Sequence, residues 1–218
     1  MDREKALRRA DAVTLETDTF VISQALAQTQ LRLSGVNFFT LEGRLGRTGR
    51  NLESFLNTFG RTVFPYRAVE LTSGATIPRC EDGFLPVYNT DLALCFPGKR
   101  ASGNDRSPYA GEIDNCLGQG YIIDELRIIC PKLLLLMGDK SRRAFYKHFL
   151  GAPRRDTLAE HIASIKEAGE LPSVKVSGLE VSVLPIQHAS GANPSFYKMV
   201  RDQALIDIVE RVLVVLSA

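Results

Sequence analysis

The 218-residue sequence contains no tryptophan, only three histidines, and no apolar run that approaches 18 residues. The missing apolar run predicts that no helix crosses a membrane. The first residues are charged and lack the apolar core of a signal peptide, so we expect an intracellular, cytoplasmic protein. With 44% hydrophobic residues the chain can form an ordinary core, and we expect one domain over residues 1–218.

An excess of one charge is also missing, because 27 Lys and Arg residues are balanced by 25 Asp and Glu residues. A net charge of +2 does not by itself indicate a nucleic-acid binder. Basic residues nevertheless cluster in residues 3–9, around Lys99 and in residues 141–148. Such clusters are usually solvated faces, but they also supply the charge that binding to a phosphate backbone requires.

The chain has no Cys-x-x-Cys pair and no glycine-rich phosphate fingerprint. Its four cysteines, Cys80, Cys95, Cys116 and Cys130, are scattered. We therefore expect reduced thiols, with a metal site as the less favoured alternative. The missing fingerprint disfavours a nucleotide-binding domain of the doubly wound type.

Apolar runs alternate with segments of helical spacing along the chain. The predicted strands are 20–26, 62–69, 87–96, 132–137 and a run over 174–184 that leads to His188. The predicted helices are 51–60, 112–129, 141–150, 158–168 and 194–217. This alternation favours a parallel sheet built from βαβ units. One helix carries His161, which we expect to be exposed.

Polar or small residues follow three of these strands, at residues 23–27, 89–91 and 188–193. In parallel sheets, sites form at the carboxyl ends of the strands. The stretch VLPIQHASGANPS (183–195) predicts a buried strand, His188 at its end, a tight loop, and a helix capped by Asn193. A histidine there can stabilise negative charge or transfer a proton. A solvated loop histidine is the alternative.

Four segments, in this order and spacing, carry a family resemblance. They are SQALA (23–27), GVNF (35–38), VYNTDLALCFPGKRASGNDRSP (87–108) followed by a helix and PKLLLLMG (131–138), and HASG (188–191). Together they resemble the uracil-DNA glycosylase superfamily, whose members carry a first motif such as GQDPY, GEAPG or GMNPG and a late motif such as HPSP. The resemblance implies a three-layer α/β/α sandwich with a central, mostly parallel four-stranded sheet.

The resemblance also implies an enzyme of base excision repair, which extrudes a nucleotide from DNA and hydrolytically removes uracil or another deaminated or damaged base. The base leaves as an anion from an oxocarbenium-like sugar. His188 would stabilise that anion, and Phe38 would stack on the base. Gln24 and Ala25 would hold the base through their backbone, within a motif that begins at Ser23. A core phenylalanine is the alternative reading of Phe38.

The implied DNA contacts are Ser190, Gly191, Ala192 and Asn193 in the minor groove, with Lys99 and Arg100 on phosphates. Small residues suit this loop because they let its backbone approach the DNA. The expected partner is thus DNA that contains uracil or another damaged base, with the protein close to the nucleoid. We expect no membrane contact, and either a monomer or a homodimer.

Two positions depart from the family pattern. Ala25 stands where efficient members have a water-positioning aspartate, so the amide of Gln24 becomes a candidate for that task. Asp91 stands where the iron–sulfur branches have a base-reading asparagine, and Asn89 is on the same face of the strand. We favour Asn89 as the reader and Asp91 as the group that activates water. There are two alternatives. The pocket prefers a base that presents hydrogen-bond donors on the edge that is read, or Asp91 is a surface or capping aspartate at the end of the strand.

No cofactor is expected. The iron–sulfur branches use an N-terminal Cys-x-x-Cys pair and two later cysteines, and only the later pair has counterparts here, Cys95 and Cys116. A cluster would therefore have to recruit Cys80 and Cys130. Two other functions stay open. One is a non-catalytic or weakly active binder of damaged or abasic DNA, which Ala25 supports, and the other is an unrelated α/β hydrolase or nucleotide-binding domain.

Overall fold

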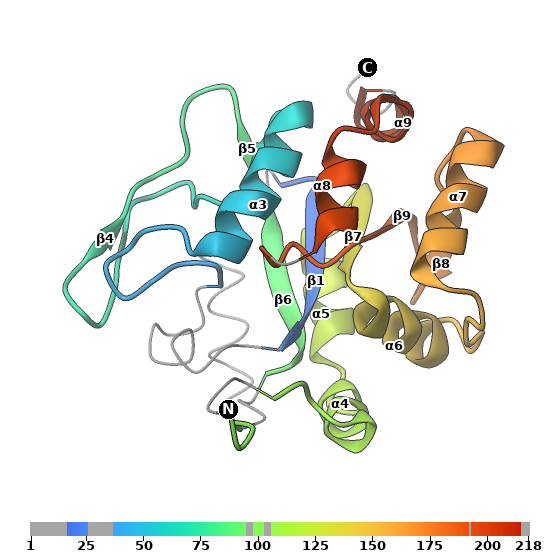
Figure 1. The fold of residues 1–218 in the computed structure, drawn as a ribbon, viewed down its shortest axis with the longest axis horizontal. Helices are drawn as coiled ribbons and strands as arrows, with labels where there is room; N and C mark the ends of the chain where they lie inside the picture. Colours follow the sequence, from blue (N-terminus) through green and yellow to red (C-terminus); the bar gives the residue numbers. More distant parts are fainter. Residues whose placement is uncertain (1–16, 26–36, 95–97, 103–105, 192, 215–218) are drawn as a thin grey trace.

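The computed structural model describes residues 17–25, 37–94, 98–102, 106–191 and 193–214. A five-stranded sheet with the order β6-β1-β7-β9-β8 forms its centre (Figure 1). The four strands β1 (Thr19–Ala25), β6 (Tyr88–Ala93), β7 (Leu133–Met137) and β9 (Leu179–Ile186) are parallel to one another. The predicted, mostly parallel sheet is confirmed, but it has five strands where four were predicted.

The fifth strand, β8 (Ser173–Val176), pairs antiparallel with β9 at the edge of the sheet. It comes from the run over 174–184, which the structure divides into two strands. Ser177 and Gly178 separate them and have φ angles of 49° and 91°. Two consecutive residues with positive φ form the tight turn that best matches the twist of a hairpin. The chain therefore folds back here instead of continuing straight toward His188.

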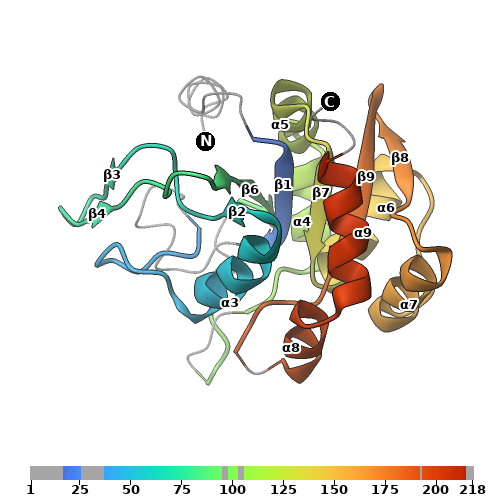
Figure 2. The same ribbon diagram turned by 90° about the horizontal axis from the view of Figure 1, so that it is seen from above.

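Helices cover both faces of the sheet (Figure 2). One face carries α3 (Arg47–Leu56), α7 (Leu158–Ala168), α8 (Pro194–Val200) and α9 (Gln203–Val214), and the other carries α4 (Ala110–Leu117), α5 (Tyr121–Ile129) and α6 (Asp139–Phe149). Strand β7 is buried along its whole length, and alternate residues enter the two cores. No helix among the described residues is long and apolar enough to span a membrane.

Two predicted helices are each divided in two. Within 112–129, α4 ends before Gly118 and α5 starts after Gly120, whose φ of 75° no ordinary helical residue adopts. Within 194–217, α8 ends at Val200 and α9 begins at Gln203, because Asp202 accepts the backbone N–H of Leu205 and caps a new helix. Residues 215–218 lie outside the described part.

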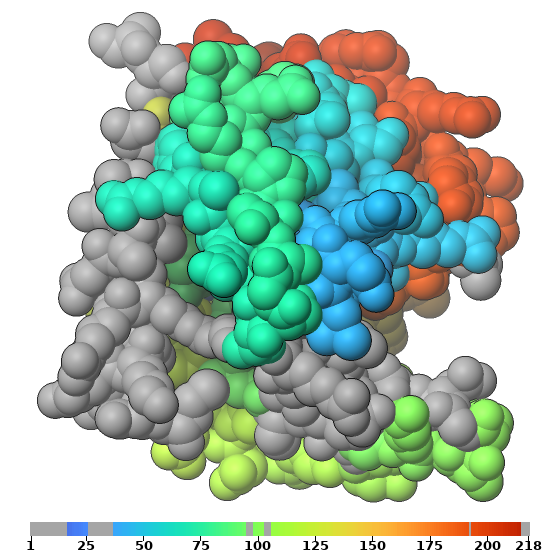
Figure 3. Space-filling model, turned by 90° about the vertical axis from the view of Figure 1, so that its left-hand side faces the viewer, coloured from blue at the N-terminus to red at the C-terminus, as the bar shows by residue number. Residues whose placement is uncertain are grey.

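The predicted strand over 62–69 is wrong, since only its two ends are extended. Residues 60–86 form the short pairs β2 (Arg61–Thr62) with β5 (Leu85–Pro86) and β3 (Val69–Glu70) with β4 (Thr76–Ile77). Phe39, Leu71 and Ile77 make a small core of their own here. Figure 3 shows this segment, coloured teal to green, spread over one side of the molecule beside α3.

Helix α3 begins four residues earlier than predicted, inside the glycine-rich stretch GRLGRTGR, and continues through the short 3-10 helix η1 (Asn57–Phe59). Gly49 is the reason that the helix can lie where it does. A Cβ atom at Gly49 would lie 2.8 Å from both the Cβ and the carbonyl oxygen of Phe38. Glycine therefore lets α3 pack directly onto the segment that follows β1.

We expect Gly49→Ala to lower the free energy of unfolding by about 1–3 kcal/mol, because the new methyl group overlaps the Cβ and the carbonyl oxygen of Phe38. Alanine's better helix propensity, worth about 1 kcal/mol, would not compensate for that overlap. Gly111→Ala in α4 is the matched control, because nothing lies within 4 Å of its added Cβ. It should raise stability by up to about 1 kcal/mol. Urea unfolding measures both, and equal effects would contradict the close packing of α3.

Candidate active site

The four parallel strands end along one edge of the sheet. Residues Ser23 and Ala25 of β1 are register partners of Asp91 and Ala93 of β6. On the other side, Met137 of β7 pairs with Ile186 of β9, and the N–H of Gly138 donates to the carbonyl of Ile186 over 2.8 Å. The described residues of the three predicted polar groups therefore lie at or near the carboxyl ends of strands along this edge.

Asp91 is buried, with 2% of its surface exposed. Its Oδ1 accepts the hydroxyl of Ser23 over 2.7 Å, and its Oδ2 accepts the side-chain Nδ2 of Asn37 over 2.7 Å. Burial raises the pKa of Asp91 to about 6, against the lowering effect of the two hydrogen bonds. The surface or capping aspartate considered above is therefore wrong, and at neutral pH the site contains a buried carboxylate.

Asn89 lies near the same hydroxyl, which is 3.4 Å from its Oδ1. Ser23 thus contacts both Asn89 and Asp91, as expected for residues two apart on one strand face. Gln24 and Ala25 follow at the end of β1, and both are half-buried. The side chain of Ser23 binds Asp91 more closely, so its main structural task is to supply a hydrogen-bond donor to the carboxylate.

His188 follows β9 and is half-buried beside Gly138. The backbone N–H of Ser190 donates to its Nδ1 over 3.2 Å. Burial lowers the pKa of His188, so the ring is neutral near pH 7. Because Nδ1 accepts a hydrogen bond, the single ring proton is on Nε2. The histidine can therefore act as a neutral hydrogen-bond donor at the edge of the sheet.

Asn193 closes the loop that follows His188. Its Nδ2 donates to the carbonyl of His188 over 3.1 Å, and its Oδ1 accepts the N–H of Ser195 over 3.1 Å. The predicted helix cap is confirmed. Ser190 and Gly191 lie in this loop, whereas Ala192 lies outside the described residues.

Helix α3 holds this loop from the other side. Asn51 donates to the carbonyl of Ala189 over 2.8 Å, and Arg47 donates to the carbonyl of Gly191 over 3.0 Å. Arg47 also lies so close that a Cβ on Gly191 would come within 1.7 Å of its Nε. Sequence reasoning missed Arg47, Asn51 and Asn37, because each acts on a partner that is 54 or more positions away.

Phe38 is buried, with 6% of its surface exposed, and belongs to the core under α3. Its φ of 71° is unusual for a bulky residue, and the N–H of Gly46 fixes its carbonyl over 2.7 Å. This burial agrees with the core reading, while stacking on a base stays a prediction. Lys99 and Arg100 are exposed in the segment after β6, where a phosphate can reach them.

The described cysteines lie on separate elements. Cys80 is buried after β4, Cys116 is on α4, and Cys130 is exposed at the end of α5. Cys95 lies outside the described residues. Among the residues with described positions, no three or more His, Cys, Asp or Glu side chains form a group that could hold a metal ion.

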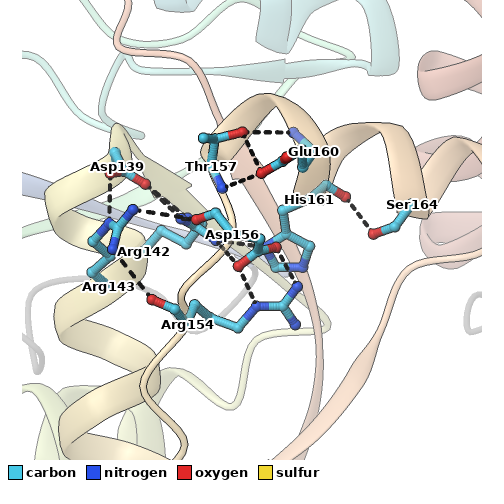
Figure 4. Close-up of polar contacts among 9 residues, drawn as sticks. All are labelled: Asp139, Arg142, Arg143, Arg154, Asp156, Thr157, Glu160, His161 and Ser164. Carbon is cyan, nitrogen blue, oxygen red and sulfur yellow. Dashed lines mark hydrogen bonds and ion pairs between the residues drawn. The ribbon is translucent and has the colours of Figure 1, made fainter.

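The expectation that His161 is exposed is wrong, since 2% of its surface is accessible. It packs edge-on against Tyr146 of α6. Figure 4 shows His161 near the fully buried Arg142. Arg142 donates to Asp139 over 2.7 Å and to Asp156 over 2.9 Å. Burial, and next the nearby charge of Arg154, lower the pKa of His161 to about 4. His161 is therefore a neutral part of the core that helps to cover an ion cluster.

The family model described as "Uracil DNA glycosylase superfamily" matches residues 14–209 of the chain. The match spans every strand of the central sheet and the edge at which Asp91 and His188 lie. No curated protein is significantly similar to the chain.

Burial of Asp91 should make stability depend on pH. The folded state keeps this proton up to about pH 6, whereas the unfolded chain releases it near the ordinary pKa of 3.8. Stability therefore falls as the pH rises through this window, by up to about 3 kcal/mol. Asp91→Asn removes the effect, so its stability relative to the wild type should increase by that amount between pH 4 and pH 7.

Urea unfolding at several pH values tests this expectation. The exposed carboxylate of Asp82 supplies the control, because Asp82→Asn removes one negative charge without changing the site. If the difference in stability between Asp91→Asn and the wild type stays constant from pH 4 to pH 7, burial does not raise the pKa of Asp91.

Proposed function

The chain belongs to the uracil DNA glycosylase superfamily, and on that premise we propose that it is a DNA glycosylase of base excision repair. It extrudes uracil or another deaminated or damaged base from DNA and hydrolyses the bond that joins the base to its sugar. The observation that carries the proposal is His188, whose Nδ1 accepts the N–H of Ser190, at the sheet edge that also holds the buried Asp91.

The chemistry needs a group that stabilises the departing base, which leaves with a negative charge. A neutral imidazole suits this task, because its Nε2–H donates a hydrogen bond that strengthens as the charge develops. The loop after His188 is held by Asn193 within the loop and by Asn51 and Arg47 from α3. A donor fixed in this way needs little rearrangement during the reaction.

In this proposal a residue other than Asp91 positions the attacking water. The carboxylate oxygens of Asp91 already accept hydrogen bonds from Ser23 and Asn37, and Asp91 is almost fully buried. In this proposal Asp91 therefore organises neighbouring side chains, which departs from the role that the sequence favoured. Gln24, half-buried at the end of β1, is the side chain of the first motif that can orient a water molecule.

A non-catalytic binder of damaged or abasic DNA on the same scaffold is the second candidate, supported by Ala25 at the water-positioning place. One assay separates the two. The protein is incubated with oligonucleotides that contain uracil, hypoxanthine, xanthine or hydroxymethyluracil, and abasic sites are then cleaved with alkali. Strand breaks with one or more of these bases support the glycosylase. Binding without strand breaks supports the second candidate.

His188→Ala should lower the single-turnover rate of base excision by roughly 10²-fold or more, because the leaving base loses its hydrogen-bond donor. His148→Ala is the control, since His148 lies on α6 and contacts Asp114 of α4. The control should excise at the wild-type rate. An unchanged rate in His188→Ala would remove this residue from the mechanism.

DNA binding should weaken as salt concentration rises, because phosphate contacts release counterions. Lys99→Ala and Arg100→Ala should each reduce the slope of log Kd against log salt by about 1. Lys175→Ala is the control, since β8 lies at the opposite edge of the sheet from β6. Equal slopes for all variants would mean that the DNA does not pass Lys99 and Arg100.

A further inference from the structure

Asn37 carries a buried polar atom that forms no hydrogen bond with any residue in the described part of the chain. The residue is 7% exposed, and its Nδ2 donates to Oδ2 of Asp91 over 2.7 Å. Its Oδ1 accepts no hydrogen bond from any residue that the structure describes. Buried polar atoms are rarely left without a partner in folded proteins, so an unsatisfied carbonyl beside a candidate active site indicates a ligand.

The direction of this amide is fixed. Rotating it by 180° would bring Oδ1 against a carboxylate oxygen of Asp91, and two acceptors would then face each other. Ser23 donates to the other oxygen of Asp91 and holds the carboxylate in place. The backbone is fixed too, because the next residue, Phe38, is bound through its carbonyl to Gly46. Asn37 therefore presents its carbonyl in one orientation.

On the premise of the proposed function, we propose that Asn37 reads the edge of the extruded base, and that Asp91 and Ser23 act as positioning residues for its amide. The free Oδ1 accepts a ring N–H of the base, and the second hydrogen of Nδ2 donates to the adjacent base carbonyl. This assignment differs from the prediction that Asn89 is the reader.

The chemistry defines the class of base. Deamination converts a ring nitrogen acceptor beside an amino group into a ring N–H beside a carbonyl. Uracil, hypoxanthine and xanthine share this N–H and carbonyl edge, whereas cytosine and adenine present the opposite pattern. An amide that could turn over would accept either pattern. An amide that Asp91 fixes accepts only one, so the pair of residues can separate uracil from cytosine and hypoxanthine from adenine.

The first test measures binding to two duplexes. One contains uracil on a 2′-fluorinated sugar, which resists cleavage, and the other contains a tetrahydrofuran abasic site. Asn37→Ala should weaken binding to the uracil duplex at least tenfold and change binding to the abasic duplex less than twofold. Asn89→Ala is the matched control and should leave both affinities within twofold. The reverse pattern, or equal losses on both duplexes, overturns the assignment.

The second test covers the case in which Asn37→Ala does not fold, which circular dichroism detects. Uncleavable N3-methyluracil lacks the ring N–H, so the wild type should bind it at least tenfold more weakly than uracil. A folded Asn37→Ala should lose this preference, because the smaller side chain leaves room for the methyl group. Equal binding of both bases by the wild type overturns the inference.

Asp91→Asn tests the positioning role, since a neutral amide at position 91 no longer dictates the direction of Asn37. The preference for uracil over cytosine should fall at least tenfold, while abasic binding stays within twofold. An unchanged preference removes Asp91 from the reading of the base. If the wild type binds these duplexes but forms no abasic sites, only the glycosylase activity fails. If it binds none of them, the proposed function fails and this inference with it.

Discussion

The buried carboxylate of Asp91 is the constraint on which the site depends. A charge in the interior is tolerated only when hydrogen-bond donors surround it. The register of β1 and β6 supplies Ser23 directly opposite, and the chain after β1 must return with Asn37 to supply the second donor. This hydrogen bond ties Asn37, the residue before Phe38, to β6. Strand β1, the edge strand β6 and Asn37 are therefore held together by one polar group.

Helix α3 extends that constraint to the histidine loop. Because residue 49 is glycine, the helix lies directly on Phe38, and the same helix sends Asn51 and Arg47 to the carbonyls of the loop after His188. One rigid element thus contacts both halves of the candidate site, which come from opposite ends of the chain. A shift of α3 would disturb its contacts with Phe38 and with the loop after His188 at the same time, so the positions of Asn37 and His188 both depend on the packing of this helix.

The sequence was sufficient for features that depend on local pattern. Segments rich in apolar residues predicted β1, β6 and β7, and the VLPIQHASGANPS stretch predicted both the position of His188 and the cap at Asn193. It failed where small residues reverse or interrupt the chain, at Ser177-Gly178 and Gly118–Gly120, since glycine permits a turn without requiring one. It also failed for contacts between distant residues. Nothing near His161 shows that Arg142 will be buried beside it, and nothing near Asn37 indicates an aspartate 54 positions away.

Burial shifts the pKa values of the two titrating groups of the site, Asp91 and His188, toward each other. Burial raises the pKa of Asp91 and lowers that of His188, so near neutral pH the edge carries one negative charge and a neutral donor. A negative charge close to a departing anion would oppose the reaction if it were unscreened. Ser23 and Asn37 direct their hydrogens at the carboxylate and reduce that opposition. Asn37 thus has two effects in the proposed mechanism, because the amide that would recognise the base also separates it from the charge of Asp91.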